Sequence, residues 1–181
     1  MTEQQNVWSY RLAREEVPEA GLHIVIEADE SVRAALAGIA GLRGLPRLAA
    51  SFDVTRSGQN GLHIEGEVTS TIGQECVVTL EPIDKNLIEP IDLTFVPDGV
   101  PSTTGLAAEA SLSGEEFDLP EPLEGGAVDL GAIATEYFLL GIDPYPRKPG
   151  AVFEAPGEPE PQASPFAALS ALKKSGAGEG Q

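Results

Sequence analysis

The residue types that most often perform chemistry in proteins are few in this sequence. It contains two histidines, His23 and His63, and one cysteine, Cys76. Both histidines fall at outward positions of predicted strands, so a Ser-His-Asp or Cys-His arrangement has few ways to form. Cys76 and His63 are at most two ligands, whereas structural zinc needs four. We therefore predict a protein that is not an enzyme and that binds no metal and no cofactor.

Two acidic pairs are the remaining candidates for acid–base or Ca²⁺ chemistry, Glu65/Glu67 and Glu115/Glu116. Alternation places Glu65 and Glu67 on the solvent face of a strand, and no EF-hand spacing surrounds either pair. The glycines lie in hairpin or loop contexts, not between a strand and a helix as a phosphate-binding loop requires. Solvated surface charge is the interpretation we adopt, and an enzyme with an unrecognised site stays as a remote alternative.

Charge is unevenly distributed along the chain, whose net charge is −18. Residues 57–146 hold seventeen acids, and such an excess repels phosphate at long range. The segment 33–56 contains Asp53 as its only acid. The acids either keep the protein soluble or form a surface for basic partners, and both interpretations stay open. The four arginines of this segment, which predict one small basic patch, are Arg33, Arg43, Arg47 and Arg56.

Length and composition indicate one domain with a tail. A chain of 181 residues suffices for one core, and no run approaches the roughly 18 apolar residues of a membrane span. The N-terminus lacks a signal-peptide pattern, and a single cysteine excludes an internal disulfide. We expect a cytoplasmic protein that does not bind a membrane, and its oligomeric state stays open.

The N-terminal third predicts two strands and a helix. Residues 7–12 and 21–28 are strand-like, because apolar side chains alternate with polar ones in the second of them. Asp29 or Ser31 is a suitable cap for a helix that starts near Val32 and continues to the Gly44-Leu45-Pro46 break, so that Arg43 lies at its end.

The middle of the chain predicts an antiparallel meander. A β-hairpin joins residues 48–55 to 62–72, and Gly66 stands where an inward apolar residue is expected, which indicates a bulge or the close approach of another backbone. Residues 75–80 and 86–96 are two further extended runs. We expect the meander to curl towards a partly closed barrel.

The last third predicts a loop, a helix and a tail. Residues 97–126 are interpreted as a long loop with one short strand. Asp129 caps a helix with an apolar stripe, and Gly141 ends it. The sequence thus predicts an α+β fold in residues 1–146, with two or three helices and a disordered tail in 147–181 that contains a short helical motif at 165–174. The stripe of the main helix consists of Leu130, Ile133, Ala134, Tyr137 and Leu140.

Three segments in order resemble the YceD-like family of large ribosomal RNA accumulation proteins, over about residues 20–175. The first is similar to the family's Cys-x-x-Cys-Leu-x-Pro signature, the second to its Asp-Leu helix and proline-rich exit, and the third to its terminal Asn-Pro-Phe-Ala ending. The residues that carry the resemblance are Cys76, Leu80, Pro82, Asp129, Leu130, Glu136, Pro144, Pro146 and the segment 165–173.

The resemblance implies a non-enzymatic factor that supports ribosomal RNA accumulation and large-subunit biogenesis. Thr79 stands where the family often has its second cysteine, so a zinc or redox site of the family is not carried over. We expect the acidic surface to bind a basic ribosomal protein or a protein–RNA intermediate, while the arginines touch RNA. The alternative is a direct RNA-binding barrel, which needs exposed aromatic residues near the arginines. In the tail, the candidate partner-binding residues are Phe166, Leu169, Leu172 and Lys173.

Overall fold

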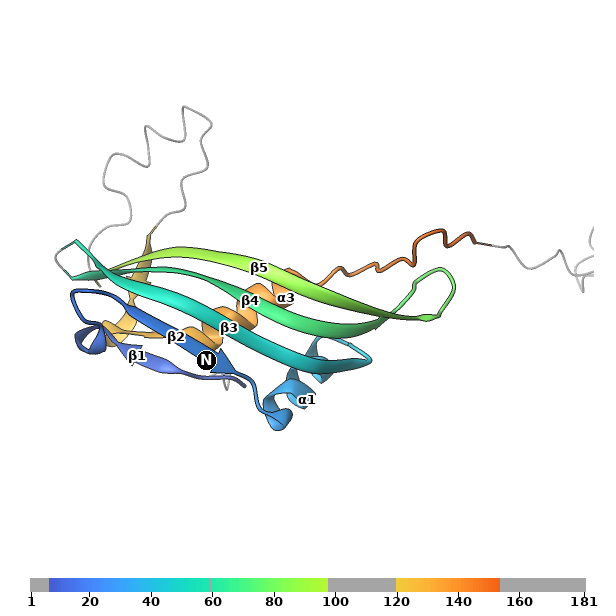
Figure 1. The fold of residues 1–181 in the computed structure, drawn as a ribbon, viewed down its shortest axis with the longest axis horizontal. Coiled ribbons are helices and arrows are strands. Elements are labelled where there is room, and N and C mark those ends of the chain that lie inside the picture. Colours follow the sequence, from blue (N-terminus) through green and yellow to red (C-terminus); the bar gives the residue numbers. More distant parts are fainter. Residues whose placement is uncertain (1–6, 59, 98–119, 154–181) are drawn as a thin grey trace, which may run out of the picture.

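A five-stranded sheet is the main feature of the computed structural model, which describes residues 7–58, 60–97 and 120–153 (Figure 1). The strand order is β2-β3-β4-β5-β6, and all neighbours are antiparallel except β5 and β6. The strands are β2 (Leu22–Glu27), β3 (Gly44–Ser57), β4 (Gly61–Glu75), β5 (Pro82–Pro97) and β6 (Glu121–Leu123).

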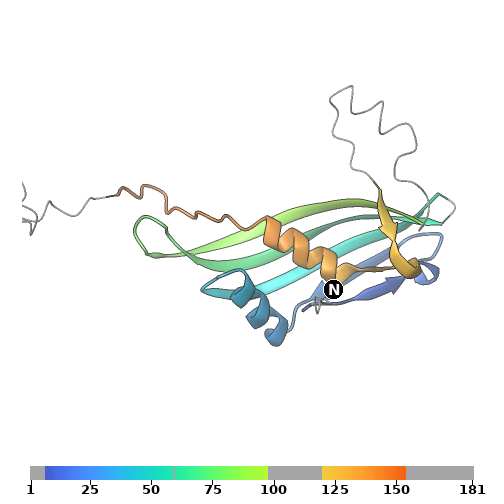
Figure 2. The same cartoon turned by 180° about the vertical axis from the view of Figure 1, so that it is seen from behind.

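Two α-helices, α1 (Glu30–Ile39) and α3 (Leu130–Leu140), lie on the same face of this sheet (Figure 2). Neither described helix has the length and apolar character that crossing a bilayer requires. A separate two-stranded sheet pairs the N-terminal region with the segment just before α3. Its strands are β1 (Arg11–Ala13) and β7 (Ala127–Asp129), and the short 3-10 helices are η1 (Arg14–Glu16) and η2 (Glu124–Gly126).

The hydrophobic core lies between α3 and the helix-covered face of the sheet. Phe52 of β3 and Ile64 of β4 are fully buried there, as is Phe138 of α3. Trp8 and Leu36 belong to the same continuous cluster. Burial of one such side chain stabilises the fold by roughly 1.5–3 kcal/mol relative to exposure. The helices and the sheet therefore form one packed α+β unit, as the sequence predicts.

The sheet is open, and the prediction of a partly closed barrel is wrong. Among the described strands β2 does not pair with β6, so the sheet keeps two edges. Strand β6 has only three residues and runs parallel to the end of β5. Because α3 covers the inner face, the core is closed by a helix and not by further strands.

Helix α1 begins where the sequence predicts and ends earlier. The side chain of Asp29 accepts a hydrogen bond from the backbone N–H of Val32 at 2.9 Å, which confirms one of the two predicted caps. The helix ends at Ile39, not near Gly44, because Gly41 adopts a left-handed φ of +62°. The N–H of Leu42 then donates to the carbonyl of Ala37 at 2.9 Å, the bond that closes a Schellman motif.

The predicted strand at residues 75–80 is wrong, because the chain turns there. The N–H of Leu80 donates to the carbonyl of Cys76 at 2.9 Å, and the N–H of Cys76 donates to Glu81 at 2.8 Å. The apolar residues of this run resemble a strand in composition, but their backbone bonds are local. Strands β4 and β5 are instead long and continuous on both sides of the turn.

The hairpin between β3 and β4 is confirmed, with Ser57 opposite Gly61. A Cβ atom at Gly66 would collide with the carbonyl oxygen of Ser51 and would lie 3.2 Å from the Cα of Phe52. The predicted close approach of another backbone is therefore confirmed. The glycine is required by contact with the neighbouring strand β3.

Helix α3 begins where the sequence predicts, but the residues that it buries differ from the predicted stripe. Asp129 caps α3, and Gly141 is the C-cap. Leu140 of the predicted stripe is 74% exposed, whereas Phe138 is fully buried. The N-terminal strand is β1, shorter than the predicted 7–12. Residues 98–119 and 154–181 lie outside the described residues, and so does the predicted helical motif at 165–174.

Candidate functional site

The turn between β4 and β5, residues 76–81, holds part of the sequence signature and is called the motif turn below. Its Leu80 has a left-handed φ of +58° and a side chain that is 69% exposed. A branched residue adopts this conformation at a cost of about 1–3 kcal/mol, so the surrounding bonds must impose it. Val77 is 46% exposed on the same turn. The turn therefore presents apolar side chains to solvent at one end of the sheet.

The segment that follows α3, residues 143–148, is bound to the motif turn and is called the exit segment. The N–H of Val77 donates to the carbonyl of Pro146 at 3.0 Å. The side-chain amide of Gln74 donates to the carbonyl of Asp143 at 2.8 Å. These bonds fix the direction in which the chain leaves α3. They also extend to Lys148, two residues beyond the predicted domain boundary at 146.

An ion pair reinforces this contact. Nζ of Lys148 lies 2.9 Å from Oε2 of Glu81. The hydrogen bond from Lys148 lowers the pKa of the Glu81 carboxyl, and the same bond raises the pKa of the Lys148 ammonium. Both side chains are about half exposed, at 49% and 53%, so water screens the attraction. The ion pair orients the exit segment more than it stabilises the fold.

Cys76 is the buried centre of the motif turn. Its sulfur accepts hydrogen bonds from the backbone N–H of Lys148 at 3.3 Å and of Thr79 at 3.5 Å. These bonds, the one from Lys148 first, lower the pKa of the thiol to about 7. Because the residue is fully buried, its thiolate is shielded from reagents. Within the described ranges, no group of three or more His, Cys, Asp or Glu residues is arranged to hold a metal ion.

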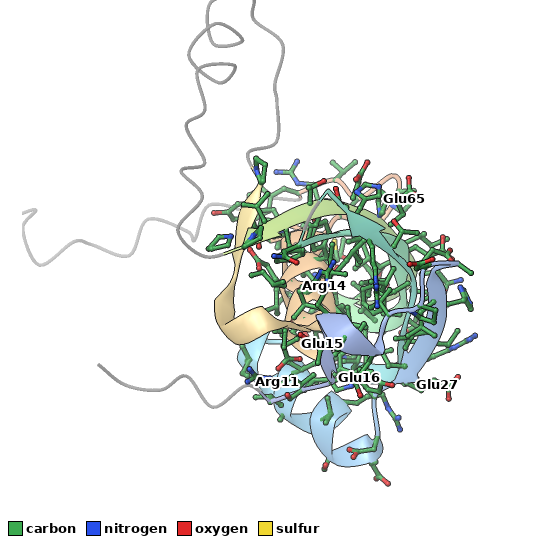
Figure 3. The ribbon with its side chains drawn as sticks, turned by 90° about the vertical axis from the view of Figure 1, so that its left-hand side faces the viewer. Arg11, Arg14, Glu15, Glu16, Glu27 and Glu65 are labelled. Carbon is green, nitrogen blue, oxygen red and sulfur yellow. The ribbon has the colours of Figure 1, made fainter. Side chains whose placement is uncertain are left out.

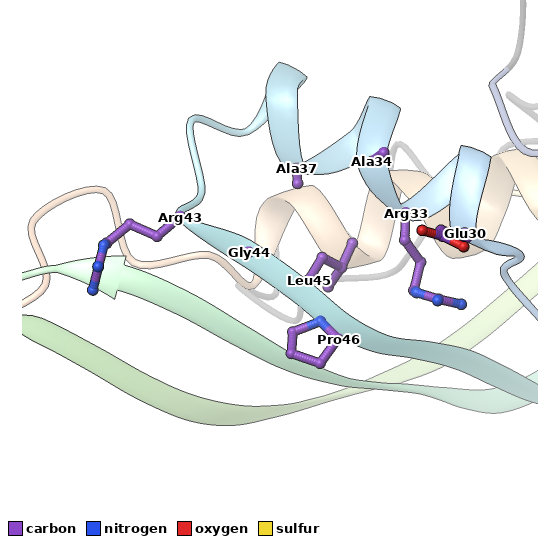
Figure 4. Close-up of a pocket in the computed structure, with 8 residues that line it drawn as sticks. All are labelled: Glu30, Arg33, Ala34, Ala37, Arg43, Gly44, Leu45 and Pro46. Atoms are coloured by element: carbon purple, nitrogen blue, oxygen red, sulfur yellow. The ribbon is translucent and has the colours of Figure 1, made fainter.

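A groove between α1 and the start of β3 lies at the same end of the sheet. Arg33 and Arg43 line it together with Glu30, and Figure 4 shows the two guanidinium groups at opposite ends of it. Nη1 of Arg33 donates to the carbonyl of Ala28 at 2.6 Å. The backbone N–H of Arg43 donates to the carbonyl of Gly73 at 2.7 Å, and this bond joins the groove to the end of β4.

The four predicted arginines do not form a single patch. Arg47 is exposed on β3 opposite Thr71, at the end where Arg33 and Arg43 lie. Arg56 is nine residues further along the strand, roughly 30 Å away. Its Nε donates to the carbonyl of Val17 at 2.7 Å. The structure therefore places Arg33, Arg43 and Arg47 in the half of the molecule that ends in the motif turn, and Arg56 at the far end.

The other signature residues have structural surroundings. Asp129 accepts hydrogen bonds from the N–H groups of Gly131, Ala132 and Tyr10, and from the hydroxyl of Ser9. Leu130 is fully buried. Elsewhere, Glu136 and Pro144 are exposed, Pro146 is half-buried and Pro82 opens β5. Four candidate binding residues, Phe166, Leu169, Leu172 and Lys173, lie outside the described residues.

A row of carboxylates on the helix-free face of the sheet was missed by sequence reasoning. Asp53, Glu65 and Asp92 lie directly opposite one another on β3, β4 and β5. Figure 3 views the molecule along the strands and shows Glu27 and Glu65 on the outer side of the sheet, away from Arg11. Counting from the hairpin turn at residues 57–61 would have paired Asp53 with Glu65. The alignment of Asp92 depends on the motif turn, which the sequence suggested was a strand.

Comparison with protein-family models matches residues 64–173 to YceD, described as large ribosomal RNA subunit accumulation protein YceD. The match begins within β4 and includes the motif turn, α3 and the exit segment. No curated protein and no solved structure matches the chain.

Proposed function

Because the chain belongs to the YceD family of large ribosomal RNA subunit accumulation proteins, we propose that it acts in large-subunit ribosome biogenesis as a non-enzymatic binding factor. The family match carries this proposal, since it covers 110 of the 181 residues, counting from 64 to 173. The family's description names the accumulation of an RNA and no reaction. We propose that the protein acts in the cytoplasm.

The partner that we propose is a basic ribosomal protein or an intermediate of protein and RNA. The distribution of charge supports this choice. Carboxylates occupy the middle of the helix-free face, whereas Arg33, Arg43 and Arg47 lie in the half of the molecule that ends in the motif turn, Arg47 on the same face as the carboxylates. The acidic face binds the basic protein, and the arginines contact RNA phosphates. The tail residues Phe166, Leu169, Leu172 and Lys173 add a short amphipathic contact with the same assembly.

Direct binding of single-stranded RNA is the second candidate and has less support. Such sites stack bases on exposed aromatic side chains. Of the three aromatic residues nearest to the arginine-rich segment in the sequence, Trp8 and Phe52 are 6% and 0% exposed, and only Tyr10 is 42% exposed. Two of these three rings are therefore buried in the core and cannot stack on bases. The described strands also form an open sheet and not the barrel that this alternative assumes.

The test is a pull-down of the tagged full chain from native cell extract at about 100 mM and about 500 mM salt, with and without RNase, because phosphate contacts weaken steeply over this range. We expect the chain to recover large-subunit precursors. Arg43→Gln/Arg47→Gln should lower the salt-sensitive part of the recovery several-fold. The control, Arg11→Gln/Arg56→Gln, removes the same charge from the far end and should recover normal amounts.

RNase-resistant recovery of one basic ribosomal protein would favour protein contact, whereas recovery that RNase abolishes would favour RNA contact. Enrichment of metabolic enzymes alone, without any large-subunit component, would refute the proposed function. Thermal melts of each variant show whether a loss of recovery comes from unfolding.

A further inference from the structure

The central part of the helix-free face of the five-stranded sheet, called the open face below, is formed by the outward side chains within residues 23–27, 49–55, 63–69 and 88–94 of β2 to β5. Side chains alternate along each strand, so the residues between the core positions point to this side. Both helices lie on the opposite face (Figure 2). The open-face residues are His23, Val25, Glu27, Ala49, Ser51, Asp53, Thr55, His63, Glu65, Glu67, Thr69, Ile88, Pro90, Asp92 and Thr94.

Negative charge dominates this surface. Five of its fifteen residues are carboxylates, and none is lysine or arginine. The nearest arginine on β3 is Arg47, one outward position beyond Ala49. The only basic side chains among the fifteen residues are His23 and His63. The open face therefore has a strong negative potential of its own, apart from the net charge of the chain.

The register concentrates this charge in one row. Asp53, Glu65 and Asp92 are direct cross-strand neighbours, so the row is about 10 Å long at the usual strand spacing. Like charges that lie directly opposite one another destabilise a sheet. Among the described residues no lysine or arginine pairs with these three carboxylates. Their nearest basic groups are His23, 2.8 Å from Asp53, and His63, 3.7 Å from both Glu65 and Asp92.

Two apolar side chains stand beside the row. Val25 on β2 is 60% exposed, and Ile88 on β5 is 64% exposed. They lie on the two outer strands of the open face, on opposite sides of the acidic centre. An occupant that fits this surface therefore carries positive charge in its middle and apolar groups at its margins. Residues 49–55 of β3 span roughly 20 Å, which is enough for a short peptide segment.

Charge decides the chemical class of the occupant. A nucleic acid backbone would place phosphates against the carboxylates and be repelled. A polypeptide rich in lysine and arginine would relieve the repulsion within the row and gain charge-assisted hydrogen bonds. We propose that the open face is the docking surface for such a basic segment, with Asp53, Glu65 and Asp92 at its centre. This inference rests on the proposed function, because it assigns a surface to the basic partner.

The experiment measures binding of the purified full chain to a fluorescent peptide of about 15 residues made of lysine, arginine and leucine, by anisotropy. The triple substitution Asp53→Asn/Glu65→Gln/Asp92→Asn, called the open-face variant, should weaken binding of the peptide about tenfold at low salt. The matched control, Glu15→Gln/Glu19→Gln/Glu75→Gln, removes three exposed carboxylates that lie outside the fifteen open-face residues, Glu75 at the far end of β4, and should stay within about twofold of the parent. Light scattering of the unliganded chain tests whether a second copy covers the face instead.

Equal weakening in both triple variants would show an effect of net charge only and would overturn the docking surface. So would failure of the parent to bind the peptide, or a dimer that the open-face variant dissolves. In the pull-down, equal recovery of large-subunit precursors by the parent and the open-face variant would refute this inference and leave the proposed function standing. Open-face-dependent peptide binding without any ribosomal component in the pull-down would refute the proposed function alone.

Discussion

Asp129 shows how one carboxylate joins distant parts of the chain. It accepts from the N–H groups of Gly131 and Ala132 at the start of α3, and from the N–H of Tyr10 at 2.8 Å. The hydroxyl of Ser9 donates to it at 2.6 Å. The N-terminal segment thus lies against the helix through the same residue that caps the helix. This explains structurally why an Asp-Leu pair stands at this point of the sequence signature.

We expect Asp129→Ala to lower the free energy of unfolding by about 2–4 kcal/mol, because it removes the cap and leaves the N–H of Tyr10 without its acceptor. Asp129→Asn should cost less, since asparagine also caps helices. Urea denaturation followed by circular dichroism measures both. Equal losses in the two variants would show that the charge, and not the capping geometry, stabilises this junction.

The sequence alone predicts those residue roles that depend on neighbouring residues in the chain. The capping function of Asp129 follows from the helical pattern after it, and the burial of Cys76 follows from its apolar neighbours. The bond between Asp129 and Ser9 spans 120 positions and has no sequence signal. The same is true of the bond from Lys148 to Cys76, which depends on where the exit segment runs.

At the scale of elements, the sequence predicted two turns from their glycines, placed the end of α1 at Gly44 and not at Gly41, and missed the motif turn, which has no glycine. The two predicted turns are the hairpin at residues 57–61 and the end of α3 at Gly141, and the structure confirms both. The motif turn contains no glycine and is rich in valine and leucine, so its composition suggests a strand. Its left-handed residue is Leu80, where sequence reasoning expects glycine or asparagine. Because this turn was missed, the sequence did not predict that Asp92 lies opposite Glu65.

Two glycine substitutions test the element packing in opposite directions. Gly66→Ala should destabilise the sheet by about 1–3 kcal/mol, because the added methyl collides with the backbone of Ser51 and Phe52 on β3. Gly38→Ala should stabilise α1 by up to about 0.5–1 kcal/mol, because Gly38 lies in the last turn of the helix and an added Cβ would meet nothing within 4 Å. Urea midpoints at constant slope measure both. A neutral Gly66→Ala would mean that β3 and β4 separate easily at this point.

At the scale of the molecule, the fold separates charges that the sequence mixes. The acidic excess was predictable from composition, and so was the arginine-rich segment. Strand β3, however, carries Arg47 and Arg56 to its two ends, and it places Asp53 between them on the open face. Position along a strand, and not proximity in sequence, therefore decides which charges act together. No pattern in the sequence gives this distribution without the sheet register.

Self-repulsion should make the stability of the whole protein depend on ionic strength. With a net charge of −18, screening by salt relieves repulsion more than it weakens attraction. We expect Tm to rise by several degrees between about 10 mM and about 300 mM NaCl at neutral pH, measured by differential scanning calorimetry. Asp53→Asn/Glu65→Gln/Asp92→Asn should raise Tm at low salt by about 2–4 °C and reduce its salt dependence, because two directly opposed pairs of like charges disappear.

The control, Glu15→Gln/Glu19→Gln/Glu75→Gln, changes the net charge by the same amount and should shift Tm less, since these carboxylates do not oppose one another in a strand register. If both variants shift Tm equally, the repulsion is spread over the whole surface and the row has no special cost. If Tm falls with salt, attractive ion pairs outweigh repulsion despite the net charge. A larger shift for the open-face variant, together with its weaker peptide binding, would mean that the surface sacrifices stability for binding.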